Sequence, residues 1–122
     1  MIVRSIHIDT AEAEAFSPAP DRIVHGNPHG ETRNAYESPD GRKYFGEWSC
    51  GKGAWRVSYS EWEYCRILEG HVRLTGDDGS VAEAGPDGNL VIEPGFEGVW
   101  ENLTAVRKLY VIDLGPPEGD AG

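Results

Sequence analysis

Residues 51–70 read GKGAWRVSYSEWEYCRILEG, and they carry the strongest fold signal in the chain. Glycines begin and end the stretch, and two short runs rich in Trp, Val, Tyr, Ile and Leu lie between them. Short runs of this composition, bounded by turn residues, are typical of β-strands. We therefore predict two consecutive strands, at residues 55–59 and 64–68.

The same pattern extends over most of the chain. Turn sequences rich in Gly, Pro and Asp separate short apolar runs, among them SPDG at residues 38–41, GDDG at 76–79 and GPDG at 85–88. Many short strands at this spacing favour a β-sandwich or barrel. One short helix, or one 3₁₀ turn, is expected at residues 10–15, where Thr10 would cap an acidic turn. The predicted strands are residues 3–8, 33–37, 43–48, 55–59, 64–68, 72–75, 81–84, 90–92, 99–102 and 107–113.

The chain is predicted to be a single domain. Its 122 residues are a usual length for one domain, and we find no internal repeat or linker. We expect a strand and an irregular lead-in at residues 1–29 and the barrel at residues 30–113. A flexible tail is expected at residues 114–122, which include the sequence GPPEGDAG.

Composition limits the classes of partner. The formal net charge is −10, with 21 acidic and 11 basic residues, and this sign opposes contact with phosphate backbones and anionic lipid. We therefore expect neither nucleic acid nor a membrane as a partner. No apolar run approaches the ~20 residues that cross a bilayer, and residues 1–15 lack the features of a signal peptide. The expected location is cytoplasmic, with Cys50 and Cys65 as reduced thiols and Cys65 buried.

Two segments resemble the motifs of the cupin superfamily. Gly51, Val57, Tyr59, Glu63 and Gly70 have the spacing of the first cupin motif. The resemblance implies an all-β jelly-roll barrel, also called a double-stranded β-helix. Such a barrel has about ten short antiparallel strands and is often dimeric.

The second cupin motif is resembled by GPDGNLVIEPGFEGVWEN at residues 85–102. Gly95 takes the position of its turn glycine and Asn102 that of its terminal asparagine. Asp87-Gly88 replaces the usual Gly-Asp step, which predicts an altered turn.

More narrowly, the chain is similar to the small single-domain "cupin 3" group, which includes uncharacterised bacterial proteins. That group is similar to ureidoglycine aminohydrolase and to ethanolamine-utilisation Q-type cupins. The further residues that carry this similarity are Gly46, Trp48, Cys65, Leu68, Pro94, Trp100, Glu101, Lys108, Tyr110 and Ile112.

The resemblance implies a metal site, but three of its four ligand positions hold other residues. Val57, Tyr59 and Gly98 stand where metal-binding cupins have histidines, and only Glu63 is kept. No histidine of this chain falls on a motif position. We therefore predict no metal and no cofactor. The four histidines are His7, His25, His29 and His71.

Strand alternation predicts a cavity inside the barrel. Side chains alternate between the two faces of a strand, so Trp55, Val57 and Tyr59 would face the interior together, as would Glu63 and Cys65. Aromatic walls with a few polar groups are typical of small-molecule pockets, although the same side chains would also serve to fill a small barrel. The predicted ligand-binding residues are Trp48, Trp55, Val57, Cys65, Trp100, Asn102, Lys108 and Tyr110.

Glu63 and Tyr59 are the candidate catalytic residues. A carboxylate that faces an apolar barrel has a raised pKa unless a cation or hydrogen-bond donors offset the loss of water. A group of this kind acts as a general acid or base near neutral pH. In the alternative, Glu63 bonds to Tyr59 or Asn102, or pairs with Lys108, and has only a structural role.

Two classes of function remain, and the sequence does not decide whether the protein is an enzyme. The first is a small cupin that binds a small molecule in an aromatic pocket, with metal-independent acid/base catalysis by Glu63. The second is a non-catalytic binding module or ligand sensor, and a metal-dependent cupin enzyme is third. The expected partners are a small-molecule ligand and a second copy of the chain, in a homodimer whose open sheet edge is covered by the strand at residues 3–8.

Overall fold

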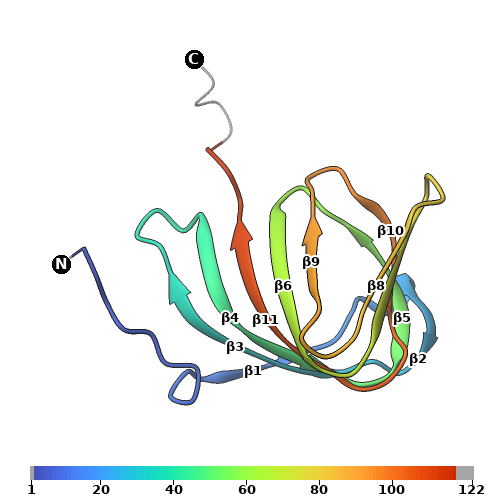
Figure 1. Cartoon of the computed structure of the whole chain (residues 1–122), viewed down its shortest axis with the longest axis horizontal. Helices are drawn as coiled ribbons and strands as arrows, with labels where there is room; N and C mark the ends of the chain where they lie inside the picture. Colours follow the sequence, from blue (N-terminus) through green and yellow to red (C-terminus); the bar gives the residue numbers. More distant parts are fainter. Residues whose placement is uncertain (1, 118–122) are drawn as a thin grey trace.

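A computed structural model describes residues 2–117, and these form two antiparallel sheets that face each other (Figure 1). The six-stranded sheet contains, in spatial order, β1 (Ala13–Phe16), β3 (Gly30–Glu37), β4 (Lys43–Cys50), β11 (Val106–Asp113), β6 (Trp62–Glu69) and β9 (Asn89–Ile92). The five-stranded sheet contains β2 (Ile23–Gly26), β5 (Gly53–Ser58), β10 (Glu97–Asn102), β7 (Val72–Gly76) and β8 (Val81–Ala84). Strands distant in sequence are neighbours in both sheets. The predicted jelly-roll barrel is confirmed.

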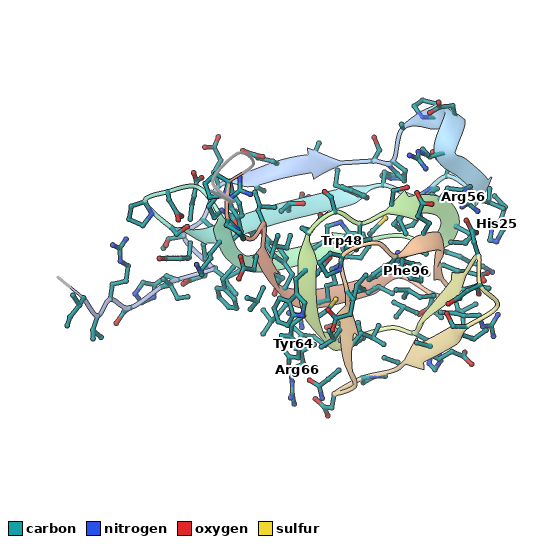
Figure 2. The ribbon with its side chains drawn as sticks, turned by 90° about the horizontal axis from the view of Figure 1, so that it is seen from above. His25, Trp48, Arg56, Tyr64, Arg66 and Phe96 are labelled. Carbon is teal, nitrogen blue, oxygen red and sulfur yellow. The ribbon has the colours of Figure 1, made fainter. Side chains whose placement is uncertain are left out.

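Alternation along the strands places the core between the two sheets. In β6, Glu63, Cys65 and Ile67 are buried, while Tyr64 and Arg66 point away from the barrel (Figure 2). In β11 the buried residues also alternate. Because both strands follow this two-residue period, their inward faces form one wall. Burial of the apolar side chains on these faces is the main source of stability in such a barrel.

The N-terminal region differs from the prediction. Residues 3–8 form no strand and pair with no other described segment, and Val3 is exposed. The helix predicted at residues 10–15 is wrong as well, because Ala13–Phe16 forms β1 and pairs antiparallel with β3. Backbone hydrogen bonds to β3, and packing of Phe16 against the core, outweigh the helix preference of this Ala- and Glu-rich run. The expected homodimer stays a prediction.

Two short elements between β1 and β3 were not predicted. A 3₁₀ turn, η1, spans Pro20–Arg22, and β2 follows it and pairs with β5. The sheets therefore begin at residue 13 and not at residue 30. None of the helical segments in residues 2–117 is long and apolar enough to cross a membrane.

The C-terminal segment predicted to be flexible is held at its start by Arg42. The Arg42 guanidinium donates hydrogen bonds to the backbone oxygens of Leu114, Gly115 and Pro116. Residues 118–122, the remainder of the predicted tail, lie outside the described residues.

Several turns contain residues with a positive φ, and three of them bear on the predicted motifs or provide a comparison. Asp87, at the step where an altered turn is predicted, has a φ of 68°. Gly70 ends the first cupin motif with a φ of +90°, and a Cβ there would collide with the backbone oxygen of Ala105. Gly79 has nearly the same φ, +88°, but open space around it. Gly70 is therefore required both for its backbone conformation and for the close approach of a neighbouring segment.

We predict that Gly70→Ala destabilises the protein more than Gly79→Ala. The left-handed conformation alone costs an alanine about 1–2 kcal/mol, which is the expected loss for Gly79→Ala. Gly70→Ala adds the collision with Ala105 and should lose at least about 2 kcal/mol more. Urea unfolding of both variants measures the difference. Equal losses of unfolding free energy would show that the turn at Gly70 and the backbone at Ala105 move apart without a measurable loss of stability.

Candidate functional site

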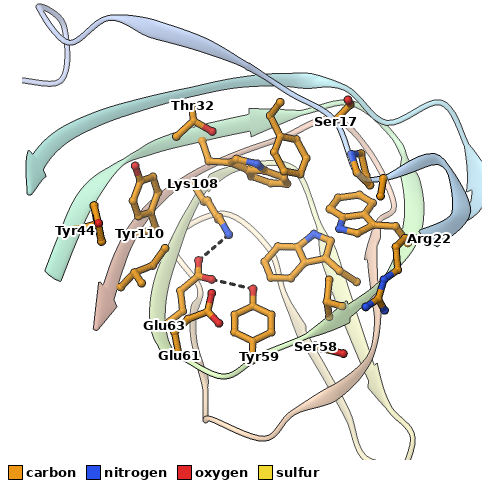
Figure 3. Close-up of a pocket in the computed structure, with 18 of the residues that line it drawn as sticks. Ser17, Arg22, Thr32, Tyr44, Ser58, Tyr59, Glu61, Glu63, Lys108 and Tyr110 are labelled. Carbon is orange, nitrogen blue, oxygen red and sulfur yellow. Dashed lines mark hydrogen bonds and ion pairs between the residues drawn. The ribbon is translucent and has the colours of Figure 1, made fainter. Parts of the chain in front are cut away.

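A pocket of about 770 Å³ opens between the two sheets. Figure 3 shows side chains from both sheets and from the N-terminal segment around it. Aromatic side chains share its walls with polar and charged ones, and its floor contains a buried pair of charged groups, Glu63 and Lys108. The aromatic residues in its lining are Phe16, Tyr44, Trp48, Trp55, Tyr59, Trp100 and Tyr110.

Glu63 and Lys108 form an ion pair between adjacent strands. Glu63 lies on β6 and Lys108 on β11, which pair antiparallel, and the inward parity of both strands directs the two side chains into the barrel. Lys108 Nζ is 2.8 Å from Glu63 Oε2, and the side chains are only 7% and 5% exposed. A buried pair is tolerated when further hydrogen bonds satisfy the remaining polar atoms.

Two neighbouring groups donate those hydrogen bonds to Glu63. Tyr59, which follows β5, donates from its hydroxyl to Glu63 Oε1 at 2.8 Å. The Cys65 thiol, two residues further along β6, donates to Oε2 at 3.3 Å. The carboxylate therefore accepts from three donors, and both of its oxygens are engaged.

The same contacts determine the charge state of the pair. Burial opposes ionisation of Glu63, but the charge of Lys108 and the hydrogen bonds from Lys108, Tyr59 and Cys65 outweigh it, so the pKa of Glu63 is lowered. For Lys108, burial favours the neutral amine, but the Glu63 carboxylate outweighs burial and the pKa of Lys108 is raised. The raised pKa expected for a solitary buried Glu63 is thus not observed.

Two indole rings complete the environment of the Lys108 ammonium. Its Nζ lies 4.6 Å from the ring centroid of Trp48 and 4.2 Å from that of Trp100. Lys108 is directly opposite Trp48 in the β4–β11 register, which explains the first contact. Cation–π attraction at such distances stabilises a desolvated ammonium.

Two further polar side chains of the barrel interior, those of Asn102 and Tyr110, have structural partners. Asn102 accepts a hydrogen bond from Trp100 Nε1 at 2.8 Å and donates to the backbone oxygens of Cys50 and Gly51. It thereby holds β10 to the turn between β4 and β5. The Tyr110 hydroxyl donates to Asn34 at 2.7 Å, and burial, with the negative charges of Glu63 and Glu14, raises the pKa of Tyr110 to about 12.

Both cysteines are buried free thiols. Burial raises the pKa of Cys50 to about 11, and burial together with the Glu63 carboxylate raises the pKa of Cys65 to about 12. Because the thiolate is the reactive form, neither cysteine is suited to be a nucleophile.

Most of the predicted site residues meet in this pocket, but two do not. Cys65 lies behind Glu63, and Asn102 is fully buried by its contacts with Trp100 and the β4–β5 turn. Neither lines the pocket, so their prediction as ligand-binding residues is corrected. The predicted residues that do line it are Trp48, Trp55, Val57, Tyr59, Glu63, Trp100, Lys108 and Tyr110.

Several lining residues were missed by the sequence analysis. Tyr44 shares the strand parity of Trp48, and this signal was sufficient to find it. Phe16 and Arg22 come from the N-terminal region, whose strands were not recognised. Glu61 lies in the turn between β5 and β6, and it too lines the pocket.

Comparison with known families decides the classification. A model of the EutQ-like cupin domain matches residues 37–110, more than half of the chain. The chain belongs to this family. The predicted similarity to ethanolamine-utilisation Q-type cupins is thereby confirmed, whereas similarity to ureidoglycine aminohydrolase stays a prediction. A comparison with proteins of curated function gave no match.

Solved structures show the same cupin fold at low sequence identity. A protein of unknown function from Pseudomonas syringae pv. tomato is 21% identical with a TM-score of 0.75, covering 84% of this chain and 45% of the other. This chain therefore spans less than half of that protein. Ethanolamine utilization protein Q from Salmonella typhimurium is 16% identical with a TM-score of 0.65 (88% and 99% covered). The polyketide cyclase RemF from Streptomyces resistomycificus is 22% identical with a TM-score of 0.67 (95% and 83% covered).

The residues of this EutQ-like cupin do not fit the metal ion that the superfamily resemblance implies. Val57 offers no donor atom, and the Tyr59 hydroxyl and both Glu63 oxygens are already paired. A Cβ at Gly98, on β10, would collide with the backbone oxygen of Thr75, so this position has no room for a histidine. The Lys108 ammonium beside Glu63 would also repel a metal cation.

We predict strong energetic coupling between Glu63 and Lys108. Removal of either partner leaves the other charge buried and unpaired, so Glu63→Gln and Lys108→Met should each lose about 3–5 kcal/mol of unfolding free energy. The double variant buries no charge at this place and should lose less than the sum of the two single losses. Urea unfolding of the four proteins gives the coupling energy.

The exposed pair Arg56–Asp77 is the matched control for this cycle. Its N–O distance of 2.7 Å is similar, but the side chains are 41% and 55% exposed. The cycle with Arg56→Gln and Asp77→Asn should therefore give at most about 1 kcal/mol. A Glu63–Lys108 coupling no larger than this would contradict the account of a desolvated pair.

Proposed function

We propose that this EutQ-like cupin binds a small organic molecule in the pocket between its two sheets. The observation that carries the proposal is the pocket itself: about 770 Å³, walled by aromatic side chains and floored by the Glu63–Lys108 pair. Small-molecule pockets have about 300–1,000 Å³ and combine apolar walls with a few fixed polar groups.

The rigidity of the floor supports the same proposal. Trp48, Trp55 and Trp100 contact one another, with ring centroids 5.8–6.4 Å apart, and Lys108 packs on two of them. A ligand would therefore contact side chains that are already ordered, and its binding free energy would not be reduced by the entropic cost of ordering them. The related folds have varied functions, so the ligand must be inferred from this pocket and not from its relatives.

Acid/base catalysis is the second candidate, and the Tyr59–Glu63 hydrogen bond is the observation that favours it. A substrate proton would move to Tyr59 Oη while the hydroxyl proton of Tyr59 moves to Glu63 Oε1. The reverse transfers would return a proton to the substrate in an isomerisation or epimerisation. We rank this candidate second because the lowered pKa of Glu63 makes the carboxylate a weak base.

We predict that small organic fragments bind in this pocket and are excluded by Val57→Phe. Val57 is half-buried on the pocket wall, and the phenyl ring of a phenylalanine there should fill part of the pocket. Val91→Phe is the matched control, because Val91 is 52% exposed on β9 and does not line the pocket. Ligand-observed NMR with a set of aromatic and aliphatic fragments makes the measurement.

The expected result is a group of fragments that binds to the wild type and to Val91→Phe but not to Val57→Phe. If no fragment binds to the wild type, or if every fragment still binds to Val57→Phe, the proposed binding function is wrong.

The catalytic candidate predicts proton exchange on carbon acids. In D₂O, the wild type should incorporate deuterium next to the carbonyl group of a bound ketone, and Tyr59→Phe should slow this by about 10²–10⁴-fold. Tyr64→Phe is the control, since Tyr64 is outward-facing and bonds to Asn89. Absence of exchange across a panel of ketones, with binding intact, would leave the non-catalytic binding module as the function.

A further inference from the structure

We propose that the pocket selects an organic cation, a small alkylammonium or quaternary ammonium compound. This inference rests on the proposed binding function and names the chemical class of its ligand. Three features of the pocket support it: its aromatic faces, its unpaired charges and the position of those charges.

The aromatic walls are suited to a positive charge. The ring faces of Trp, Tyr and Phe are electrostatically negative and attract ammonium groups, most strongly where water is excluded. The protein itself demonstrates this at the floor of the pocket, where the Lys108 ammonium lies over Trp48 and Trp100. Above the floor, the partly buried rings of Phe16, Tyr44 and Tyr59 face the same cavity.

The charges that remain unpaired in the lining are mainly negative. Lys108 is neutralised by Glu63, and Arg56 pairs with Asp77. Among the described residues, Glu14, Glu37 and Glu61 line the pocket without an ion-pair partner, whereas Arg22 is the one unpaired cation of the lining. This excess of carboxylates agrees with the net charge of −10, and a low-dielectric cleft focuses such a field.

Two of these carboxylates, Glu14 and Glu61, act on the tyrosines of the pocket. Burial and the charge of Glu63 are the main causes of the raised pKa values of Tyr110 and Tyr59. The negative charge of Glu14 adds to the shift at Tyr110, and that of Glu61 makes a smaller addition at Tyr59. Both fields therefore reach these tyrosines. Figure 3 shows Arg22 on the opposite side of the pocket from Glu61, Tyr44 and Tyr110. An ammonium group would lie among the tyrosines, beside Glu61 and away from Arg22.

An organic cation fits this environment better than a metal ion does. A metal ion requires several oxygen, nitrogen or sulfur ligands at short distance, and no group of three His, Cys, Asp or Glu residues in the described chain is able to supply them. An alkylammonium group needs only aromatic faces and a nearby negative charge.

Three ligands of one shape and different charge test the inference. Choline is the cation, 3,3-dimethylbutan-1-ol is its neutral counterpart and 3,3-dimethylbutyrate is a similar anion. Isothermal titration calorimetry should show choline binding about tenfold or more tightly than the alcohol, and no binding of the anion. Equal affinity for choline and the alcohol, or tighter binding of the anion, would overturn the inference.

Variants that remove one charge at a time sharpen the test. Glu61→Gln should weaken the binding of choline several-fold and leave the affinity for the alcohol unchanged. Arg22→Gln should strengthen the binding of choline. Glu83→Gln on β8, outside the lining, is the control and should change neither ligand. If Glu61→Gln and Glu83→Gln have the same effect, choline is attracted by the general charge of the protein and the site assignment is wrong.

The two proposals fail in distinguishable ways. Suppose that the wild type binds the alcohol as tightly as choline and that Val57→Phe loses this binding. The pocket is then a binding site, but the cation class is refuted. If none of the three compounds binds, the cation class is also refuted, and the fragment measurement decides separately whether the pocket binds any small molecule.

Discussion

The chemistry of this barrel depends on the buried ion pair between Glu63 and Lys108. Removing two charges from water costs several kcal/mol for each ion, and only good geometry together with further hydrogen bonds offsets this cost. Here the offset comes from a contact of 2.8 Å, from donors at Tyr59 and Cys65 and from two indole faces. These groups come from β4, the turn after β5, β6, β10 and β11. The pair therefore connects both sheets, and the aromatic core is arranged around it.

The same pair explains how the cupin barrel is organised around a retained glutamate without the usual histidines. In place of an ion bound by several side chains, the chain supplies a positive charge of its own on β11, and the glutamate is neutralised by Lys108. The absence of space at Gly98 is consistent with this arrangement. With the floor fixed, the ligand selection that we propose would fall to lining residues above it, in η1, β1, β3 and the turn between β5 and β6.

The central strands were predictable because their sequences alternate and are bounded by turns, whereas the N-terminal strands were not. β1 owes its conformation to β3, in which the paired residues lie 14–20 positions further along the chain, and its own sequence favours helix. Strand parity placed Trp55, Val57, Tyr59 and Glu63 correctly, but a pair between Glu63 and Lys108 also requires Lys108 to point inward, and alternation along one strand does not fix which of its faces is the inner one. The sign of the pKa shift of Glu63 depends on that orientation, across a sequence separation of 45 residues. The sequence offered Lys108 as one of several possible partners of Glu63, and the folded structure identifies it as the cation that neutralises the carboxylate.

The protonation state of Glu63 tests the central claim most directly. Carbon-13 NMR of the side-chain carboxyl groups, with the Glu63 resonance assigned from Glu63→Gln, follows ionisation in the folded protein. The account predicts that the Glu63 carboxyl stays ionised from about pH 5 to about pH 8, since its pKa lies below that of an ordinary glutamate. A Glu63 carboxyl that takes up its proton near neutral pH would contradict the account, because Lys108 would then not hold the carboxylate in its charged form.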